Sequence, residues 1–343
     1  MDKALLSDYP GVKGAHFLVT GGAGFIGSNI AEHLLHAGAR VRIFDNFFSG
    51  RRVNLEEVRS ATGKDFELIT GDVREMQAVR EAMKGIDYVL HQAAIPSVPR
   101  SCTDPESTNQ VNIDGTLNVL VAARDAGVKR VTVASSSSVY GETPTLPKIE
   151  NMALDPLSPY AVSKLATETY AKVFYGIYGL ETTALRYFNV FGPRQDPTSA
   201  YAAAIPNFVT AALANRPIHI YGDGEQTRDF TFITNVVRAN VGSCFVPNSP
   251  GKIMNIAGGK RITINEIVQN VIKAAGSTSK VVHEPARKGD IRHSLASVDL
   301  AGEILGYNRI VGLEEGLERT IAWYRRDAQG NAQGVAKVQS VAP

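Results

Sequence analysis

The chain has 343 residues, of which 44% are hydrophobic and 20% charged, and its formal net charge is +2. These values are ordinary for a folded soluble protein and give no reason to expect an acidic partner such as nucleic acid. No apolar run approaches the roughly 18–20 residues that span a bilayer, and the first residues lack a signal peptide's apolar segment. We therefore expect a cytoplasmic protein without a membrane partner. Cys102, Cys244 and the scattered histidines lack metal-ligand spacing, so we expect free thiols and no metal.

The first recognisable unit is a strand, a glycine-rich turn and a helix. His16–Thr20 is a compact apolar run, residues 21–27 read GGAGFIG, and Ser28–Ala37 has a helical pattern. Glycines allow backbone N–H groups to approach a pyrophosphate at the helix N-terminus, where the helix dipole favours anions. A second strand, Arg40–Phe44, ends at Asp45, which lies 18 residues after the last glycine. That spacing matches the acidic residue that binds adenosine ribose hydroxyls, and its charge favours NAD over NADP.

Strands and helices keep alternating over the next 140 residues or so. Such alternation predicts an α/β fold of the Rossmann type, a doubly wound parallel sheet whose ligands lie at the carboxyl ends of the strands. The expected strands are Phe66–Thr70, Ile86–His91, Lys129–Ala134 and Glu181–Tyr187, and the expected helices are Arg74–Lys84, Asp104–Ala126 and Ala161–Tyr178.

The regular alternation weakens after residue 193, which predicts a smaller mixed α/β lobe that closes over the strand ends. We assign residues 1–190, together with about 229–255, to an NAD-binding domain, residues 191–228 and 256–327 to the smaller lobe, and residues 328–343 to a mobile tail. The expected helices are Ala203–Ala214, Thr234–Phe245, Thr263–Ala275 and Leu313–Arg326, and the expected extended pieces are Pro217–Tyr221, Arg228–Phe232, Ile253–Ala257 and Lys280–His283.

The segment 158–164, SPYAVSK, places Tyr160 and Lys164 four residues apart at the start of a predicted helix. Residues four apart share a helix face, so a phenol and an ammonium group are expected side by side. A nearby cation can lower the pKa of an acid by roughly 1–3 units, which would make Tyr160 a usable base. Taken alone, the pair could equally be two surface residues on an amphipathic helix.

Taken together, these motifs resemble the extended short-chain dehydrogenase/reductase family, and within it the nucleotide-sugar epimerases, over roughly residues 16–327. Three further segments resemble the UDP-N-acetylglucosamine 4-epimerase branch: SVPRS at 97–101, RQDP at 194–197 and YAAAIP at 201–206. The shared motifs are TGGAGFIG at 20–27, HQAA at 91–94, SSSSVYG at 135–141, SPYAVSK at 158–164, LRYFNVFGPRQ at 185–195 and YGDG with RDF between 221 and 230.

The resemblance implies a redox epimerisation at C4 of a UDP-sugar. Tyr160 would be the base, Lys164 would lower its pKa and bind the nicotinamide ribose, and Ser136 and Ser137 would assist at the 4-hydroxyl. NAD⁺ would take a hydride from C4 and return it to the other face of a 4-keto sugar. The implied cofactor-binding residues are Gly21, Gly24, Phe25, Ile26, Gly27, Asp45, Asn46, Ser49, Gly50, Asp72, Val73, Gln92, Ala93, Ala94, Tyr160, Lys164 and Tyr187. The implied substrate-binding residues are Ser97, Val98, Asn189, Ala204, Ile220, Arg228, Arg287, Asp290 and Ser294.

Several observations narrow the reaction and the sugar. Related 4,6-dehydratases and decarboxylases carry carboxylates where this chain has Ser137 and Ser138, and elimination requires such an acid and base. Ser294 stands where a tyrosine closes the 2-position pocket in enzymes restricted to UDP-glucose, so we expect UDP-GlcNAc and UDP-GalNAc to interconvert, with UDP-glucose as a slower substrate. The arginines Arg228 and Arg287 suit the two charges of UDP.

Other functions remain open at this point. A UDP-glucuronate 4-epimerase is the nearest competing class. A non-catalytic NAD-sensing protein of the same fold is a further alternative, because fold alone does not give function. A net reductase that consumes NADPH is disfavoured by Asp45. In the family, two helices equivalent to 104–126 and 161–178 pair with their twofold mates, so a homodimer is expected.

Overall fold

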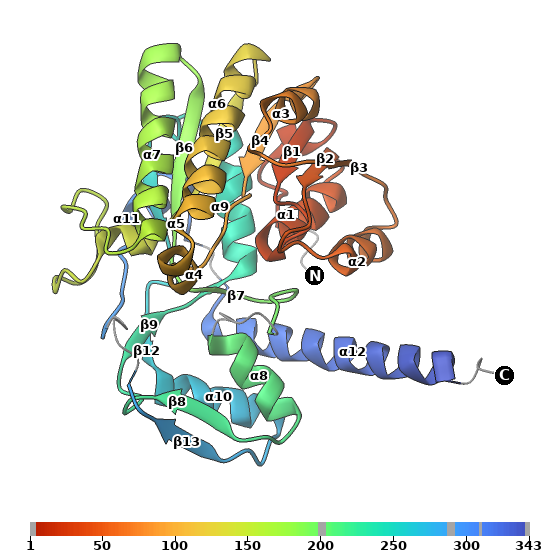
Figure 1. Cartoon of the computed structure of the whole chain (residues 1–343), viewed down its shortest axis with the longest axis vertical. Coiled ribbons are helices and arrows are strands. Elements are labelled where there is room, and N and C mark those ends of the chain that lie inside the picture. Colours follow the sequence, from red (N-terminus) through yellow and green to blue (C-terminus); the bar gives the residue numbers. More distant parts are fainter. Residues whose placement is uncertain (1–4, 198–203, 287–291, 309–310, 340–343) are drawn as a thin grey trace.

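A seven-stranded parallel sheet forms the centre of the computed structural model, which describes residues 5–197, 204–286, 292–308 and 311–339 (Figure 1). The strand order is β3-β2-β1-β4-β5-β6-β11, so the chain starts in the middle and builds outward in both directions. The strands β1, β4, β5, β6 and β11 are buried over most of their length, as a sheet covered on both faces requires, whereas β3 at the edge is partly exposed. Their bounds are β1 (His16–Thr20), β2 (Arg40–Asp45), β3 (Glu67–Thr70), β4 (Tyr88–His91), β5 (Arg130–Ser136), β6 (Glu181–Tyr187) and β11 (Ile253–Ile256).

Helices cover both faces of this sheet. One core joins the sheet to α1, α2 and α9, and a second core joins it to α3, α6 and α7. This is the doubly wound arrangement that the alternation of strands and helices predicts. The bounds are α1 (Phe25–His36), α2 (Arg52–Thr62), α3 (Met76–Met83), α6 (Gly115–Asp125), α7 (Pro159–Tyr178) and α9 (Ile233–Phe245). Between β4 and α6 lie α4 (Val98–Thr103), α5 (Pro105–Asn109) and a π-helical turn (Gln110–Asp114), and short 3₁₀ turns are formed by Pro10–Val12 and Ser137–Tyr140.

A smaller lobe lies beyond the carboxyl ends of the strands, at the bottom of Figure 1. It holds three short two-stranded pairs, β10 with β7, β12 with β9, and β13 with β8. Helices α8 and α10 pack on each other, and α12 packs on both. The bounds are β7 (Val190–Phe191), α8 (Ala204–Leu213), β8 (Ile218–Tyr221), β9 (Thr227–Asp229), β10 (Thr231–Phe232), β12 (Arg261–Thr263), α10 (Ile264–Ala275), β13 (Val281–Glu284) and α12 (Leu313–Gln339). Helix α11 (Asp299–Leu305) packs instead on β11 and α9 of the sheet domain.

The structure differs from the sequence analysis in three helices. Helix α2 was not predicted, although Leu55 and Val58 bury one face of it. The helix predicted from Asp104 to Ala126 is present and begins where Asp104 caps α5, but residues 110–114 in its middle form a π-helical turn, where the side chain of Asn112 bonds Ile95 and Ser163. Helix α12 continues to Gln339, beyond Arg326, where the predicted helix ended.

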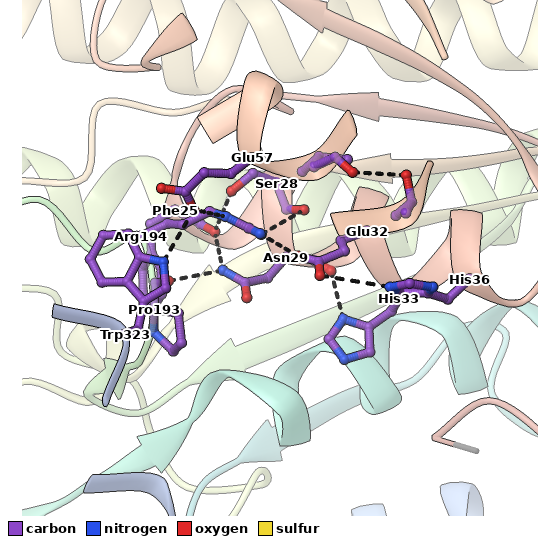
Figure 2. A network of polar contacts seen from close by, with 12 residues as sticks. Phe25, Ser28, Asn29, Glu32, His33, His36, Glu57, Pro193, Arg194 and Trp323 are labelled. Atoms are coloured by element: carbon purple, nitrogen blue, oxygen red, sulfur yellow. Dashed lines mark hydrogen bonds and ion pairs between the residues drawn. The ribbon is translucent and has the colours of Figure 1, made fainter. Parts of the chain in front are cut away.

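A buried ion cluster ties the lobe to the sheet domain (Figure 2). Arg194, which follows β7, donates to Glu32 of α1 and, at 3.0 Å, to Glu57 of α2. Glu57 also accepts from the indole N–H of Trp323 in α12 at 3.1 Å. Pro193 accepts from the side chain of Asn29 at 3.0 Å. The chain that leaves the sheet is therefore held against the helix that begins at the glycine turn. None of the described helices is both long and apolar enough to cross a membrane.

Candidate active site

The glycine turn leaves the N-terminus of α1 open for a ligand. Gly24 is the N-cap residue, and no side chain caps the helix. A Cβ on Gly27 would lie 2.2 Å from the carbonyl oxygen of Gly21, and one on Gly21, whose φ is +66°, would lie 2.8 Å from the backbone nitrogen of Ala93. Only glycine allows this approach of backbone to backbone. The free N–H groups and the positive end of the helix dipole suit a pyrophosphate, so this part of the site fits NAD.

Two carboxylates at the ends of β2 and β3 complete this end of the site. Asp45 is buried and accepts from Ala23 N at 2.9 Å and Phe47 N at 2.8 Å. Burial raises the pKa of Asp45, and these two hydrogen bonds oppose the shift. Asp72 accepts from both Nε and Nη2 of Arg74, at 2.9 and 2.8 Å, and from the Asn46 amide at 2.8 Å. The Arg74 guanidinium is the main reason that the pKa of Asp72 falls to about 2.

A cavity of about 720 Å³ runs along the carboxyl ends of the strands. Asp72 and Lys164 do not line it, but both support residues that do. Among the predicted catalytic and substrate residues, Ser136, Ser137, Ser97 and Asn189 line the cavity. The predicted cofactor residues in its wall are Gly21, Gly24, Phe25, Ile26, Gly27, Asp45, Asn46, Ser49, Gly50, Val73, Gln92, Ala93, Ala94, Tyr160 and Tyr187.

Tyr160, Lys164 and Ser136 meet where α7 crosses the end of β5. Tyr160 and Ser136 both lie in the cavity wall, and the Ser136 hydroxyl is close enough to the phenol to act on its pKa. Lys164 is buried, its ammonium lies 5.9 Å from the centre of the Tyr160 ring, and it donates to the carbonyl oxygen of Ala134 at 2.9 Å. Ser158 caps α7 by accepting from Ala161 N at 3.1 Å, so the helix begins directly before the tyrosine.

The direction of the Tyr160 pKa shift corrects the sequence analysis. Burial raises the pKa of Tyr160 above 10.0, and the hydrogen bond with Ser136 opposes that rise. Burial also lowers the pKa of Lys164 to about 8. The protein alone therefore does not produce an acidified phenol, because removing both groups from water outweighs their proximity. What it supplies is a buried phenol in the same cavity wall as Ser136.

Two further residues of the cavity wall, Tyr187 and Asn189, are held in place by hydrogen bonds. The Tyr187 hydroxyl donates to Gln92 Oε1 at 3.1 Å and interacts with the side chain of Asn240. Asn189 sits at a positive φ of 32° and donates from its amide to Asp229 O at 2.9 Å. Because Ser136 pairs with Tyr187 in the sheet register, the two strands present these side chains together.

The other predicted substrate residues have mixed outcomes. Val98, Ala204, Arg228 and Ser294 lie outside the cavity wall described above. Ile220 also lies outside this wall: its side chain is 1% exposed and packs in the lobe core, because β8 alternates buried and exposed residues. Arg287 and Asp290 lie outside the described residues.

The cavity also contains residues that the sequence analysis did not select. The Arg100 guanidinium from α4 lies 4.4 Å from the centre of the Phe48 ring, which belongs to the loop after β2. Both line the cavity, as do Arg74, Gln195 and Asp196. Arg100 and Gln195 fall inside the quoted motifs SVPRS and RQDP, which was the available signal. The contact between Arg100 and Phe48 could not be read from residues 52 positions apart.

Comparisons with known proteins agree with this geometry. The model of the NAD dependent epimerase/dehydratase family matches residues 17–257. The UDP-glucose 4-epimerase of Mycolicibacterium smegmatis is 37% identical over 91% of this chain and 99% of its own length. The UDP-glucuronate 4-epimerase of Thermodesulfobacterium geofontis is 34% identical over 92% of this chain and 97% of its own.

A solved structure extends the similarity to the fold. The UDP-N-acetylglucosamine 4-epimerase from Methanobrevibacter ruminantium, in complex with UDP-N-acetylmuramic acid, is 39% identical and superimposes with a TM-score of 0.86. The match covers 92% of this chain and 99% of that one. With its glycine turn, Asp45 and the Tyr160–Lys164 pair around one cavity, the chain belongs to the NAD-dependent epimerase/dehydratase family, and it is an extended short-chain dehydrogenase/reductase enzyme that uses NAD.

Proposed function

We propose that the protein inverts C4 of a UDP-hexose through a 4-keto intermediate, with UDP-GlcNAc and UDP-GalNAc as its main pair and UDP-glucose and UDP-galactose as a slower pair. The observation that carries this proposal is the position of Tyr160 and Ser136 in the wall of one cavity that also contains the glycine turn. The phenol and the predicted pyrophosphate site thus open onto the same cavity.

The chain's own residues bind, orient and move a proton. Tyr160 accepts the 4-hydroxyl proton, directly or through Ser136, and later returns it. Ser136 and Ser137 hold the oxygen at C4, and Lys164 holds the nicotinamide side of the site. When bound, NAD supplies the oxidation of C4 and the matching reduction. Since burial raises the pKa of Tyr160, the phenol is a weak base in the protein alone, and the positive charge that oxidised NAD would bring to the site would favour its deprotonation.

The positions of the carboxylates support simple inversion. Among the described residues of the cavity wall, the carboxylates are Asp45, Asp104 and Asp196. Asp45 accepts backbone N–H groups, Asp104 caps α5, and Asp196 lies 4.0 Å from Arg51. Residues 136–138, near Tyr160, are all serines and provide no carboxylate. Elimination at C5 and C6 requires such a group, so a dehydratase reaction is disfavoured.

The choice of sugar rests on Ser294 and on the relatives. Ser294 is half-buried, and its N–H donates to the carbonyl oxygen of Thr227 at 3.1 Å, which places it next to Arg228 in the lobe. A serine at this position leaves more room than a tyrosine would, which favours an N-acetyl group. The solved UDP-N-acetylglucosamine 4-epimerase adds support. UDP-glucuronate is the second candidate, because one of the relatives above is a UDP-glucuronate 4-epimerase.

The decisive experiment offers each substrate separately. Purified protein with NAD is incubated with UDP-GlcNAc, UDP-glucose or UDP-glucuronate, and the products are resolved from their C4 epimers. We expect the highest kcat/KM with UDP-GlcNAc and a lower value with UDP-glucose. Preferred turnover of UDP-glucuronate would select the second candidate, and a 4-keto-6-deoxy product would contradict inversion altogether.

A further inference from the structure

Three residues of α7, each one turn apart, contact three consecutive residues of β5. Tyr160 lies with Ser136 in the cavity wall. Lys164 donates to Ala134 O at 2.9 Å. Glu168 accepts from the Ser135 hydroxyl at 2.8 Å. The first two contacts belong to the site proposed above, whereas Glu168 is not part of the cavity wall.

Glu168 is held by a buried charge from a third element. Arg186 of β6 donates from Nε to Glu168 Oε2 at 2.9 Å and from Nη2 to Oε1 at 2.6 Å. Glu168, Arg186 and Ser135 are each 2% exposed. Arg186 also donates to the Tyr140 hydroxyl at 2.8 Å, and it pairs with Ser135 in the register of β5 and β6. The two strands that carry Ser136 and Tyr187 are thereby joined to one side chain of the catalytic helix.

Net stability is a weak reason for this arrangement. The desolvation of two buried charges offsets most of their attraction, so a buried ion pair often stabilises a fold less than apolar residues would. Geometry is the stronger reason. A slip of α7 by one residue would move Tyr160 by about 1.5 Å along the axis and rotate it by about 100°. Such a slip would separate Ser135 from Glu168 in a dry interior, where an unpaired polar group is costly.

We propose that Glu168 is a positioning residue: its bonds with Ser135 and Arg186 fix α7 in the one register on β5 that puts the Tyr160 phenol against Ser136. The inference rests on the proposed roles of Tyr160 and Ser136. It assigns to Glu168 no contact with substrate or cofactor. Its effect is therefore expected on the chemical step and not on binding.

Two variants disrupt the bonds of Glu168 with Ser135 and Arg186 to different extents. Ser135→Ala deletes one hydroxyl and leaves the ion pair intact, and the double variant Glu168→Gln/Arg186→Met removes both charges together so that neither is left unpaired. Ser243→Ala is the matched control, because this buried hydroxyl of α9 bonds Thr132 of the same strand β5 at 2.6 Å. For each protein, kcat, KM, bound NAD and the melting temperature are measured with the UDP-sugar that the wild type prefers.

We expect Ser135→Ala and the double variant each to lower kcat by roughly tenfold or more, with KM and bound NAD unchanged, since small misplacements of reacting groups cost this much. Ser243→Ala should keep wild-type kcat. The triple variant Ser135→Ala/Glu168→Gln/Arg186→Met should have a kcat no lower than that of the more impaired of the two variants, because all three substitutions disrupt the same contact between α7 and the sheet. If Ser135→Ala does not fold, the double variant is compared with Ser243→Ala in its place.

Three results would overturn the inference: wild-type kcat in the folded variants, an equal loss in Ser243→Ala, or losses that multiply when the substitutions are combined. The last result would mean that Ser135 acts on the ligand directly from the cavity wall. A Tyr160→Phe protein separates this inference from the proposed function. If Tyr160→Phe keeps turnover, the assignment of the base fails, whereas if it is inactive and Ser135→Ala is not impaired, only the role of Glu168 fails.

Discussion

At the scale of single residues, Tyr160 carries the proposed chemistry. Its phenol is a titratable group that lies with Ser136 in the cavity wall. Replacing it with phenylalanine keeps the ring and removes the proton acceptor, so we expect kcat to fall by about 10²–10⁴-fold while NAD stays bound. Steady-state turnover together with the amount of bound NAD tests this. Ordinary turnover in Tyr160→Phe would refute the assignment.

The burial of Lys164 serves the proposed function and lowers the free energy of unfolding. Its folded pKa of about 8 lies below the unfolded value of about 10.4, so the unfolded chain binds more protons between these values. Burial of the charged lysine therefore lowers the free energy of unfolding fully below pH 8, and this loss disappears as the pH rises to about 10. We expect Lys164→Met, studied without NAD, to be more stable than the wild type at pH 7, by up to about 3 kcal/mol.

Urea unfolding at several pH values tests this expectation. The advantage of Lys164→Met should shrink between about pH 8 and pH 10 as the wild-type lysine loses its proton. Lys172→Met is the control, because Lys172 is exposed on the same helix and should show no such trend. A stability difference that stays constant with pH would show that lost packing, and not the buried charge, distinguishes the proteins.

Ser294 is the residue on which the choice of sugar depends. Ser294→Tyr should narrow the space next to Arg228 and lower kcat/KM for UDP-GlcNAc by about tenfold or more, with a smaller loss for UDP-glucose, because buried overpacking costs roughly 1–3 kcal/mol. Parallel assays with both sugars measure the ratio. Equal losses for the two sugars would count against a role for Ser294 in selectivity.

At the scale of elements, the turn between β1 and α1 depends on the absence of side chains. Because a Cβ on Gly27 would lie 2.2 Å from Gly21 O, Gly27→Ala must displace the turn. We expect NAD affinity to fall about ten- to hundredfold, which corresponds to the roughly 1–3 kcal/mol of overpacking. Titration with NAD measures the change. Gly176→Ala in α7 is the control, since nothing lies within 4 Å of its Cβ and NAD affinity should stay unchanged.

At the scale of the whole molecule, α7 presents an apolar face to the outside. Val162, Val173 and Ile177 are 48%, 39% and 71% exposed, and their spacing places them on one side of the helix. We propose that a second copy of the chain covers this face. Ile177→Arg should shift the protein from dimer to monomer in sedimentation experiments, whereas Val282→Arg, an equivalent change in β13, should not. A wild-type monomer would contradict the proposal.

The sequence predicted those parts of the fold and of the site that depend on short segments of the chain. The glycine turn, Asp45 and the Tyr160–Lys164 pair each act within a few residues or across one strand–turn–helix unit, so spacing alone indicated their geometry. The helix α2 and the π-helical turn within the helix after Asp104 were missed, because Leu55 and Asn112 make contacts with partners far away in the sequence.

The sequence by itself determined the parallel α/β architecture and NAD as the cofactor, because hydrophobic period and glycine geometry are local properties of the chain. Only the tertiary structure decided that the Tyr160 pKa rises, that Ile220 is buried in the lobe core, and that Glu168 and Arg186 meet beneath the site. Desolvation and long-range pairing depend on which distant segments exclude water from a group, and no local pattern contains that information.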